Sequence, residues 1–278
     1  MAMGRLCILL FAVLATNLQA QEMFTFSGKV VNASGEAVEY ASIGVPGKNI
    51  GTFSATDGTF SLLLPAGFAD TLYAGHVSYE AVKIPAAELP GSGEPIIMTE
   101  RVLGEVVVYD GEKREGRLAG RGMRVAGAAT MWDTSNIGCE IGSVVETDRL
   151  FEVREVEFRV RSNSIGGARF SVNIYRAVEE TGEFLNTLCT PLYIDIPLCS
   201  ERLDIVASFS ENVVIEPGRY FVSIMFVACD ETAEASSAGG RIYFPLYMKR
   251  SYKRSAIMAG IEECPVNMGL VVRGYEYR

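Results

Sequence analysis

Hydrophobic and polar residues alternate with a period of two along most of this chain, and no long stretch shows helical spacing. Between residues 22 and 109 the alternating runs are short. They are separated by clusters of Gly, Pro, Asn, Asp and Ser such as "NASGEA" at 32–37 and "ELPGSGEP" at 88–95. Short strands at such close intervals are typical of an antiparallel sandwich. We therefore predict a first β-sandwich domain over residues 22–109.

The run "GTFSATDGTFSLLLP", residues 51–65, shows this pattern with a break at Asp57 and Gly58. Both residues tolerate a positive φ, which predicts a tight hairpin turn that pairs the flanking segments. Three alternate residues of the second segment form its predicted core face: Phe60, Leu62 and Leu64. Asp57 as a calcium ligand is the alternative, but the repeated acidic pattern of an EF-hand loop is missing. We interpret the turn as architecture.

The second half returns to alternation after a change in composition. Residues 110–136 are rich in Gly, Ala and Arg, and we predict a linker there, with docking of its basic residues on anionic lipid or lipopolysaccharide as the alternative. Strand-like runs follow at 150–162, 168–178 and 212–228, the last with a Pro-Gly turn inside it. These runs predict a second sandwich, jelly-roll-like, over residues 137–278.

The first twenty residues have the pattern of a signal peptide. Arg5 precedes an apolar stretch, Leu6 to Ala15, that is too short to span a bilayer, and Ala20 offers a small residue for cleavage. Cys7 lies inside the apolar stretch, and no cysteine stands at its end for a lipoprotein cleavage site. A membrane anchor is the alternative, but no later run reaches ~18 continuous apolar residues. We therefore predict an exported protein without a transmembrane segment once residues 1–20 are removed.

The composition limits the partners and the cysteine chemistry. The formal net charge is -9, which disfavours nucleic acid, because Lys and Arg supply most of the affinity for phosphates. An odd number of cysteines follows residue 20, and an oxidising compartment would permit disulfides among them. Cys189 and Cys199 could close a short loop, but the connectivity does not follow from sequence. The absence of C-x-x-C spacing argues against a thioredoxin-like site or a zinc ribbon. The five cysteines are Cys139, Cys189, Cys199, Cys229 and Cys264.

Catalytic residues are scarce in this sequence. His76 is the only histidine of the chain, so neither a histidine-rich zinc site nor the usual Ser/His/Asp or Cys/His arrangement can be assembled around several histidines. A lone histidine on a strand is more often a satisfied core or edge residue than a general base. We predict a protein that is not an enzyme and that uses no cofactor and no metal. A hydrolase that relies on His76 is the alternative.

Motifs between residues 26 and 109 occur in a characteristic order. A "G-x-V" strand precedes a turn at Gly35 and Glu36, an "A-S-I" strand follows, then "G-T", "D-G-T-F-S" and a closing "L-G-E-V-V-V". In this order they resemble the carboxypeptidase D regulatory-like domain, which is abundant in envelope proteins of Bacteroidetes and often forms the N-terminal extension of their TonB-dependent receptors. Ser78 departs from the family, which more often has Gly there. The resemblance implies a transthyretin-like, seven-stranded Greek-key sandwich with no chemistry of its own.

The second half is similar to the domain that often follows this one in small exported Bacteroidetes proteins, on "IGCEIGSVVE" at 137–146 and on the runs around 156–176 and 212–227. That similarity implies no known activity. Residues 105–111 are similar to the segment that leads into a TonB-contacting box, although a final Val-rich strand is our preferred interpretation. A complete receptor is excluded, because the remaining chain cannot supply a large barrel. The predicted fold class is all-β, a transthyretin-like Greek-key sandwich followed by a jelly-roll-like β-sandwich.

One sequence patch is a candidate binding surface. The run "YFPLYMKRSYKRS" interleaves aromatic and basic residues, a combination suited to stacking on sugar rings and pairing with acidic groups. A charged turn with inward-packed aromatics is our preferred interpretation of the run, because charge runs usually mark solvated turns. The candidate ligand or partner residues are Tyr243, Tyr247, Arg250, Tyr252, Lys253 and Arg254. An exposed tyrosine platform would support glycan binding, and buried Tyr247 and Tyr252 rings would oppose it.

The combined expectation is a non-catalytic exported protein of the periplasm, outer membrane or cell surface. Its leading function is protein interaction or assembly with another envelope protein. The alternatives are a glycan-binding accessory protein of a polysaccharide uptake or adhesion system, and a hydrolase. Nucleic acid is not an expected partner.

Overall fold

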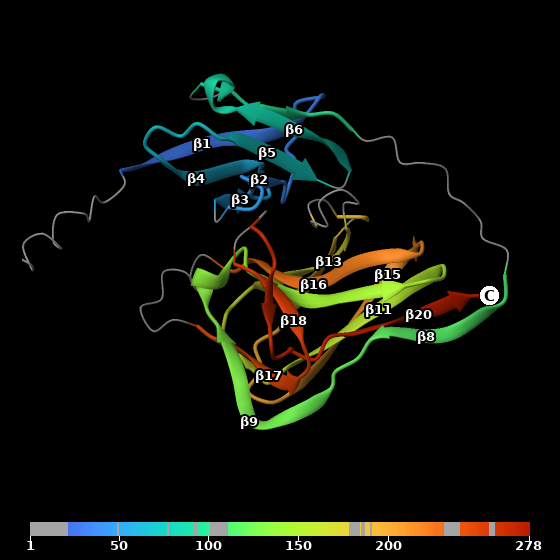
Figure 1. Ribbon diagram of the computed structural model, residues 1–278. Helices are drawn as coiled ribbons and strands as arrows, with labels where there is room; N and C mark the ends of the chain where they lie inside the picture. Colours follow the sequence, from blue (N-terminus) through green and yellow to red (C-terminus); the bar gives the residue numbers. More distant parts are fainter. Residues whose placement is uncertain are drawn as a thin grey trace, which may run out of the picture.

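The computed structural model describes residues 22–48, 50–76, 78–91, 94–100, 111–177, 184, 187–189, 191–230, 240–255 and 259–278. Strands dominate these ranges, which also contain two short 3-10 turns, η2 (Ala86–Glu88) and η3 (Thr134–Asn136). The predicted all-β sandwich architecture is confirmed (Figure 1). Within the described ranges, no helix is long and apolar enough to cross a membrane. The predicted signal peptide at 1–20 and the predicted closing strand at 105–110 lie outside the described residues.

The described part of the first sandwich contains seven strands in two sheets, ordered β4-β1-β7 and β3-β2-β5-β6. β4 returns beside β1 after two strands in the other sheet, which is a Greek-key connection. The core between the sheets is formed by alternating inward residues of both. The strands are β1 (Met23–Asn32), β2 (Ser42–Gly44), β3 (Gly51–Phe53), β4 (Thr59–Pro65), β5 (Thr71–His76), β6 (Tyr79–Pro85) and β7 (Ile96–Met98).

The turn at Asp57 and Gly58 forms, but it is not the predicted hairpin turn. Asp57 Oδ1 accepts hydrogen bonds from the Thr59 main-chain N–H at 2.9 Å and from its hydroxyl at 2.6 Å. Gly58 has a φ of 81°, and a Cβ there would lie 2.5 Å from the Val30 carbonyl oxygen. The turn therefore packs against β1 and leads from β3 in one sheet to β4 in the other, so the predicted pairing of its flanks is wrong. The core face of β4 is confirmed: Phe60, Leu62 and Leu64 are buried.

The second sandwich contains a six-stranded sheet ordered β14-β13-β16-β10-β18-β19, a four-stranded sheet ordered β15-β11-β20-β8, and a three-stranded sheet ordered β12-β17-β9. All three contribute to one hydrophobic core. The strands are β8 (Lys113–Ala119), β9 (Met123–Trp132), β10 (Glu140–Thr147), β11 (Phe151–Val160), β12 (Ser162–Asn163), β13 (Ala168–Arg176), β14 (Leu192–Ile196), β15 (Leu203–Ile215), β16 (Gly218–Ala228), β17 (Ile242–Met248), β18 (Ser251–Arg254), β19 (Glu262–Cys264) and β20 (Val271–Tyr277).

Aromatic rings fill the centre of this core. Phe170 of β13 stacks on Phe226 of β16 with ring centroids 4.9 Å apart. The ring centroid of Trp132 on β9 lies 6.0 Å from that of Phe170 and 5.6 Å from that of Phe244 on β17. These contacts join strands of the six-stranded and three-stranded sheets, so the small sheet belongs to the same packed body.

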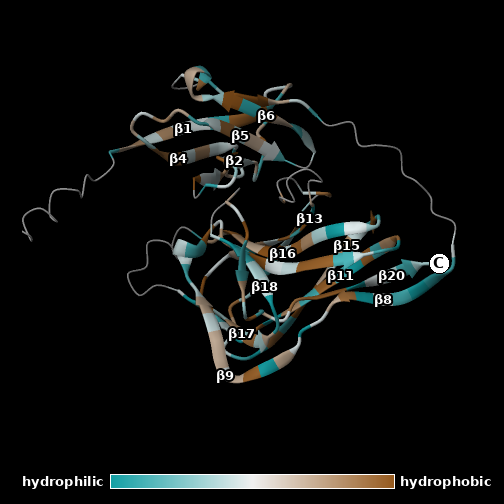
Figure 2. Cartoon of the chain, viewed as in Figure 1, coloured by the Kyte–Doolittle hydropathy of each residue, from teal (hydrophilic) through white to brown (hydrophobic). Residues whose placement is uncertain are grey.

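The linker predicted at 110–136 is wrong, because most of it belongs to the second sandwich. β8 pairs with β20 and β9 pairs with β17. The segment is polar because β8 is a sheet edge whose side chains face solvent, and Figure 2 shows its hydrophilic character. A Cβ at Gly116 would lie 2.9 Å from the Phe151 ring, so glycine allows β8 to cross that ring closely. The main-chain N–H of Arg278 donates to the carbonyl of Glu112 at 3.1 Å, which closes this edge.

The five cysteines after residue 20 are all partly buried, and four of them are free thiols: Cys139, Cys189, Cys199 and Cys264. Cys189 and Cys199 do not form the disulfide that the sequence permits. Burial raises the pKa of the Cys189 thiol to about 12 and also raises that of Cys139, which keeps both thiols protonated near neutral pH.

Candidate binding cleft between the two sandwiches

The outer face of the six-stranded sheet is turned toward the first sandwich (Figure 1). Along β16, Val222 and Ile224 point into the core of the second sandwich, whereas Ser223 and Met225 point outward. Met225 packs against Phe53 and Tyr73 of the first sandwich. Because neighbouring residues of a strand face opposite sides, one strand serves both the core and the seam between the sandwiches.

A cavity of about 260 Å³ lies in this seam. It is lined by residues of β5 and β6 on one side and of β13 and β16 on the other. The aromatic lining residues are Tyr40, Phe53, His76, Tyr79, Tyr175 and Tyr193. Polar groups are supplied by Ser171, Asn173 and Arg254. Aromatic walls with a few convergent polar groups are the usual composition of a ligand pocket.

Tyr40 connects the two sandwiches. Its φ of 52° makes it the one non-glycine residue with positive φ among the described residues. Its ring lies 4.9 Å from that of Tyr193 on β14, and its hydroxyl accepts a hydrogen bond from Arg169 Nη1 at 3.2 Å. Arg169 is fixed in turn by Asp195, with 2.7 Å between Nε and Oδ1. A strained backbone held by such contacts is a common feature of functional sites.

Glu140 and Arg254 form a buried ion pair beside the cavity. Their residues are 1% and 4% exposed, and Arg254 Nη1 lies 3.3 Å from Glu140 Oε2. Glu140 Oε1 accepts hydrogen bonds from Asn173 Nδ2 at 3.0 Å and from the Ser223 hydroxyl at 2.5 Å. Arg254 Nη2 donates to the carbonyl of Phe184. Four strands and a loop therefore hold the pair in place.

Two atoms of this pair lack a hydrogen bond. Both Glu140 Oε2 and Arg254 Nε are buried without a hydrogen-bond partner among the described residues. The Arg254 guanidinium lies 5.0 Å from the centre of the Tyr175 ring. Burial, and then the negative charge of Glu140, raise the pKa of the Tyr175 hydroxyl well above its usual value. Glu140 Oε2 still faces Arg254 Nη1 in the ion pair, whereas Arg254 lines the cavity, so its open Nε donor points to a missing partner there.

His76 lies on the opposite wall. Its Nδ1 accepts a hydrogen bond from the Ser78 main-chain N–H at 3.2 Å, and its ring lies 5.3 Å from that of Tyr79. Burial lowers its pKa, which keeps the imidazole neutral. Among the hydrogen bonds of the described residues, none joins His76 to a serine hydroxyl, a cysteine thiol or a carboxylate. This geometry is that of a half-buried wall residue.

The tyrosine and arginine patch predicted from the sequence is not one exposed surface. Tyr247 is 3% exposed and its hydroxyl accepts a hydrogen bond from Arg159, and Arg254 is the buried member of the ion pair. The segment is divided between β17 and β18, which belong to different sheets. The remaining patch residues are Tyr243 and Tyr252, which are half-buried, and Arg250 and Lys253, which are exposed and pair with Glu263 and Glu262. The structure places only Arg254 in the cleft.

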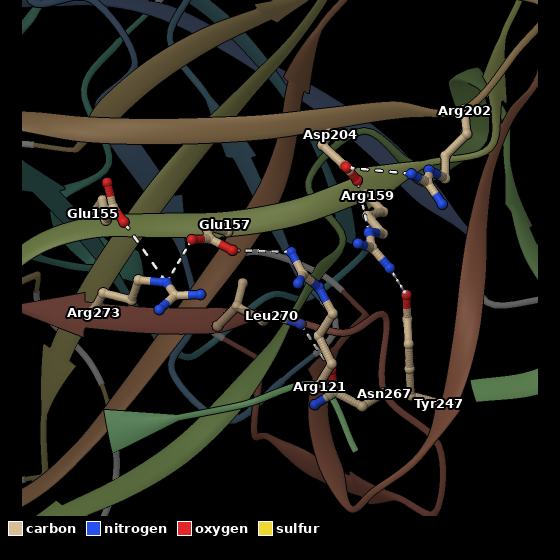
Figure 3. Close-up of polar contacts among 10 residues, drawn as sticks. All are labelled: Arg121, Glu155, Glu157, Arg159, Arg202, Asp204, Tyr247, Asn267, Leu270 and Arg273. Atoms are coloured by element: carbon tan, nitrogen blue, oxygen red, sulfur yellow. Dashed lines mark hydrogen bonds and ion pairs between the residues drawn. The ribbon is translucent and has the colours of Figure 1, made fainter. Parts of the chain in front are cut away.

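The open face of β11 and β20 carries a row of ion pairs (Figure 3). Arg273 Nε lies 2.5 Å from Glu157 Oε1 and 3.7 Å from Glu155, and Arg121 Nη2 lies 3.0 Å from Glu157 Oε2. Further along, Asp204 pairs with both Arg159 and Arg202. These charges pair with one another on a solvent-facing sheet, and Glu155, Glu157 and Arg273 also line an open hollow of about 690 Å³ there. Arg121 Nε is buried without a hydrogen-bond partner among the described residues.

The sequence did not single out Tyr40, Asn173 or Glu140. An acidic residue inside the mostly apolar and small "IGCEIGSVV" run is the one local sign of a buried carboxylate. Its partner lies on a strand far along the chain, so its role depends on the fold. Within the described ranges, no cluster of three or more His, Cys, Asp or Glu side chains is placed to hold a metal ion.

Comparisons with known proteins assign no family. No protein-family model matches the chain, and no curated protein matches it. Among solved structures, the chain is similar to a chain of the T13 particle of infectious bursal disease virus, with 9% identity, a TM-score of 0.29, and coverage of 95% of this chain and 79% of that one. A structure of the Gx strain of the same virus gives 12% identity and a TM-score of 0.29, with 94% and 66% covered. Likenesses this distant identify neither family nor function.

Proposed function

We propose that this chain is a non-catalytic, exported envelope protein that acts by binding, as an interaction or assembly module. The cleft between the sandwiches receives a small group of its envelope partner. One observation carries this proposal: an aromatic-lined cavity of about 260 Å³ beside a buried arginine whose Nε has no hydrogen-bond partner. The location in the periplasm, the outer membrane or the cell surface rests on the sequence of residues 1–20 and on the family resemblance.

The construction of the seam supports this proposal. Every strand pairing of the described residues stays within one sandwich, so the seam is made by side chains such as Tyr40, Tyr193 and Met225. A second cavity of about 260 Å³ adjoins Phe53 and Ile137 in the same seam. Small, partly hollow contacts between domains permit relative adjustment, which is useful for a protein that closes on a partner.

Catalysis has less support than binding. The hydrogen bond of His76 goes to a main-chain amide, and its lowered pKa opposes the protonated form. A hydrolase would need this side chain to exchange protons with a nucleophile or with water. Binding requires only the walls and polar groups already described.

The proposal is tested by filling the cleft. Ala81 is exposed on β6 and lines the cavity, so Ala81→Trp is expected to occupy the mouth without disturbing the core. Val206→Trp on β15 is the matched control, because Val206 is 54% exposed and does not line the cavity. The mature protein, residues 21–278, and both variants are used as bait in a detergent extract of the native cell envelope, with mass spectrometry and sugar composition analysis.

We expect the wild-type protein and Val206→Trp to retain the same stoichiometric component, and Ala81→Trp to lose it by tenfold or more. Equal capture by all three proteins would show that the partner binds elsewhere and would refute the cleft as its binding site. Thermal unfolding of each variant checks that the sandwiches remain folded.

A further inference from the structure

We propose that the cleft binds a single neutral saccharide ring, either free or at the end of a glycan chain. This inference rests on the proposed function, and it names the chemistry of the group that enters the cleft. It moves glycan binding from the sequence patch to a different set of residues, in which Arg254 is the one shared member.

The charge of the cleft favours a neutral ligand. Among the described residues that line it, Arg254 is the one charged residue besides Glu80, which is exposed at the mouth, and Glu140 compensates Arg254 from behind at 3.3 Å. A ligand carboxylate would compete with Glu140 for the guanidinium, and an ammonium group would meet Arg254. Burying either charge without its own partner is costly.

The open donor of the ion pair suits a hydroxyl group. Arg254 lines the cavity and its Nε has no hydrogen-bond partner, whereas Glu140 lies behind it and is not a lining residue. A ligand hydroxyl can accept from Nε without displacing the Arg254–Glu140 pair. Ser171 and Asn173, which also line the cavity, add further polar groups on the same wall.

The aromatic walls suit the faces of a sugar ring. Tyr40 and Tyr193 lie against each other at 4.9 Å on one side, and Tyr79 lies next to His76 at 5.3 Å on the other. Aromatic faces pack well against the C–H faces of a ring whose hydroxyls point outward toward polar groups. A ligand with an apolar face and a hydroxylated rim therefore matches both kinds of lining.

The size of the cavity limits the ligand to about one ring. The cavity has a volume of about 260 Å³. A six-membered sugar with its hydroxyls is of this order, whereas a peptide strand or a longer oligosaccharide would have to extend into solvent.

The test measures binding of defined sugars by calorimetry and by saturation-transfer NMR. The probes are the methyl glycosides of glucose, galactose, mannose, fucose and N-acetylglucosamine, compared with glucuronate and 6-amino-6-deoxyglucose. We expect at least one neutral glycoside to bind with a Kd in the millimolar range or tighter, and both charged sugars to bind at least tenfold more weakly than that glycoside. Val206→Trp should bind as the wild type does, and Ala81→Trp should not bind.

Glu140→Gln tests the charge argument more directly, because it removes the negative charge of residue 140 and keeps the shape of its side chain. The preference should shift at least tenfold toward glucuronate, since Arg254 then lacks its counter-ion. If this variant does not fold, the wild-type selectivity and the Ala81→Trp comparison still decide the question.

The proposal is overturned if no neutral glycoside binds at 50 mM, if a charged sugar binds the wild type best, or if Ala81→Trp binds normally. Loss of sugar binding alone does not refute the proposed function. An envelope protein that Ala81→Trp fails to capture, together with no sugar binding, would leave the cleft as a protein-binding site and refute only the saccharide.

Discussion

The two outer faces of the second sandwich use the same residue types in opposite ways. On the open face, Arg273 pairs with Glu157 at 2.5 Å in a row of half-exposed ion pairs. On the covered face, Arg254 pairs with Glu140 at 3.3 Å, with both residues almost fully buried. Solvent screens the open row, whereas burial makes each charge on the covered face depend on its partners. Glu152 on β11 is buried as well, but its partner Lys113 is half-exposed, so burial of both partners is what distinguishes the covered face.

The largest expected effect comes from breaking the buried pair. Arg254→Met removes one partner and leaves Glu140 as an uncompensated buried charge, so we expect a loss of about 3–5 kcal/mol in the free energy of unfolding. Urea denaturation measures it. The double variant Glu140→Gln with Arg254→Met should recover much of the loss, because no buried charge remains. A single variant as stable as the wild type would show that the pair is accessible to water.

A smaller effect is expected from removing a hydrogen-bond donor to Glu140. Ser223→Ala leaves Oε1 with Asn173 alone, and we expect a loss of about 1–3 kcal/mol for an undersatisfied buried group. The matched control is Ser61→Ala, an exposed serine on β4, which should change stability little. If both substitutions had equal effects in denaturant titrations, the hydrogen bond to Glu140 would be energetically unimportant.

Substitutions in the row of ion pairs on the open face should change the free energy of unfolding least. Arg273→Ala breaks contacts with Glu155 and Glu157, yet exposed pairs contribute only about 0–1 kcal/mol. The small difference should shrink further at high salt, because the interaction is screened. Denaturation at low and high ionic strength checks this. A loss comparable to that of Arg254→Met would remove the contrast between the two faces.

His76 should make the free energy of unfolding depend on pH. Burial lowers its pKa below the usual 6.5, so between these two pKa values the unfolded chain binds more protons than the folded chain. The His76 contribution is fully present above pH 6.5 and is lost as the pH falls through the lowered pKa. His76→Gln should therefore be less sensitive than the wild type to acidification over this range. Thermal unfolding at a series of pH values would reveal identical slopes if His76 had no role.

Local sequence patterns predicted local structure well and long-range pairing poorly. Period-two alternation located β4 and its core face, and Asp57 with Gly58 marked a real turn. The same residues do not specify which strand lies beside them, so the hairpin was mispredicted. Residues 113–132 were mistaken for a linker because an edge strand tolerates the polar composition of a loop.

Local sequence patterns could not predict the candidate cleft, for the same reason. Glu140 and Arg254 meet only because β10 pairs with β18, and Tyr40 approaches Tyr193 only through the placement of the two sandwiches. The sequence patch selected Arg254 for its exposed charge, but the structure gives it a buried partner. Pairing between strands that are far apart in the sequence decides which polar residues become buried. No short sequence motif predicts that pairing.

The pairing of β8 with β20 also has a mechanical consequence. The two strands are antiparallel, and Glu112 and Arg278 lie side by side at one end of the ladder. Tension applied between the first sandwich and residue 278 would therefore load this ladder at its end and separate its hydrogen bonds one at a time, as in a zipper. Hydrogen bonds that break one at a time separate at low force. The β8–β20 pairing would therefore open before the other strand pairings of the second sandwich.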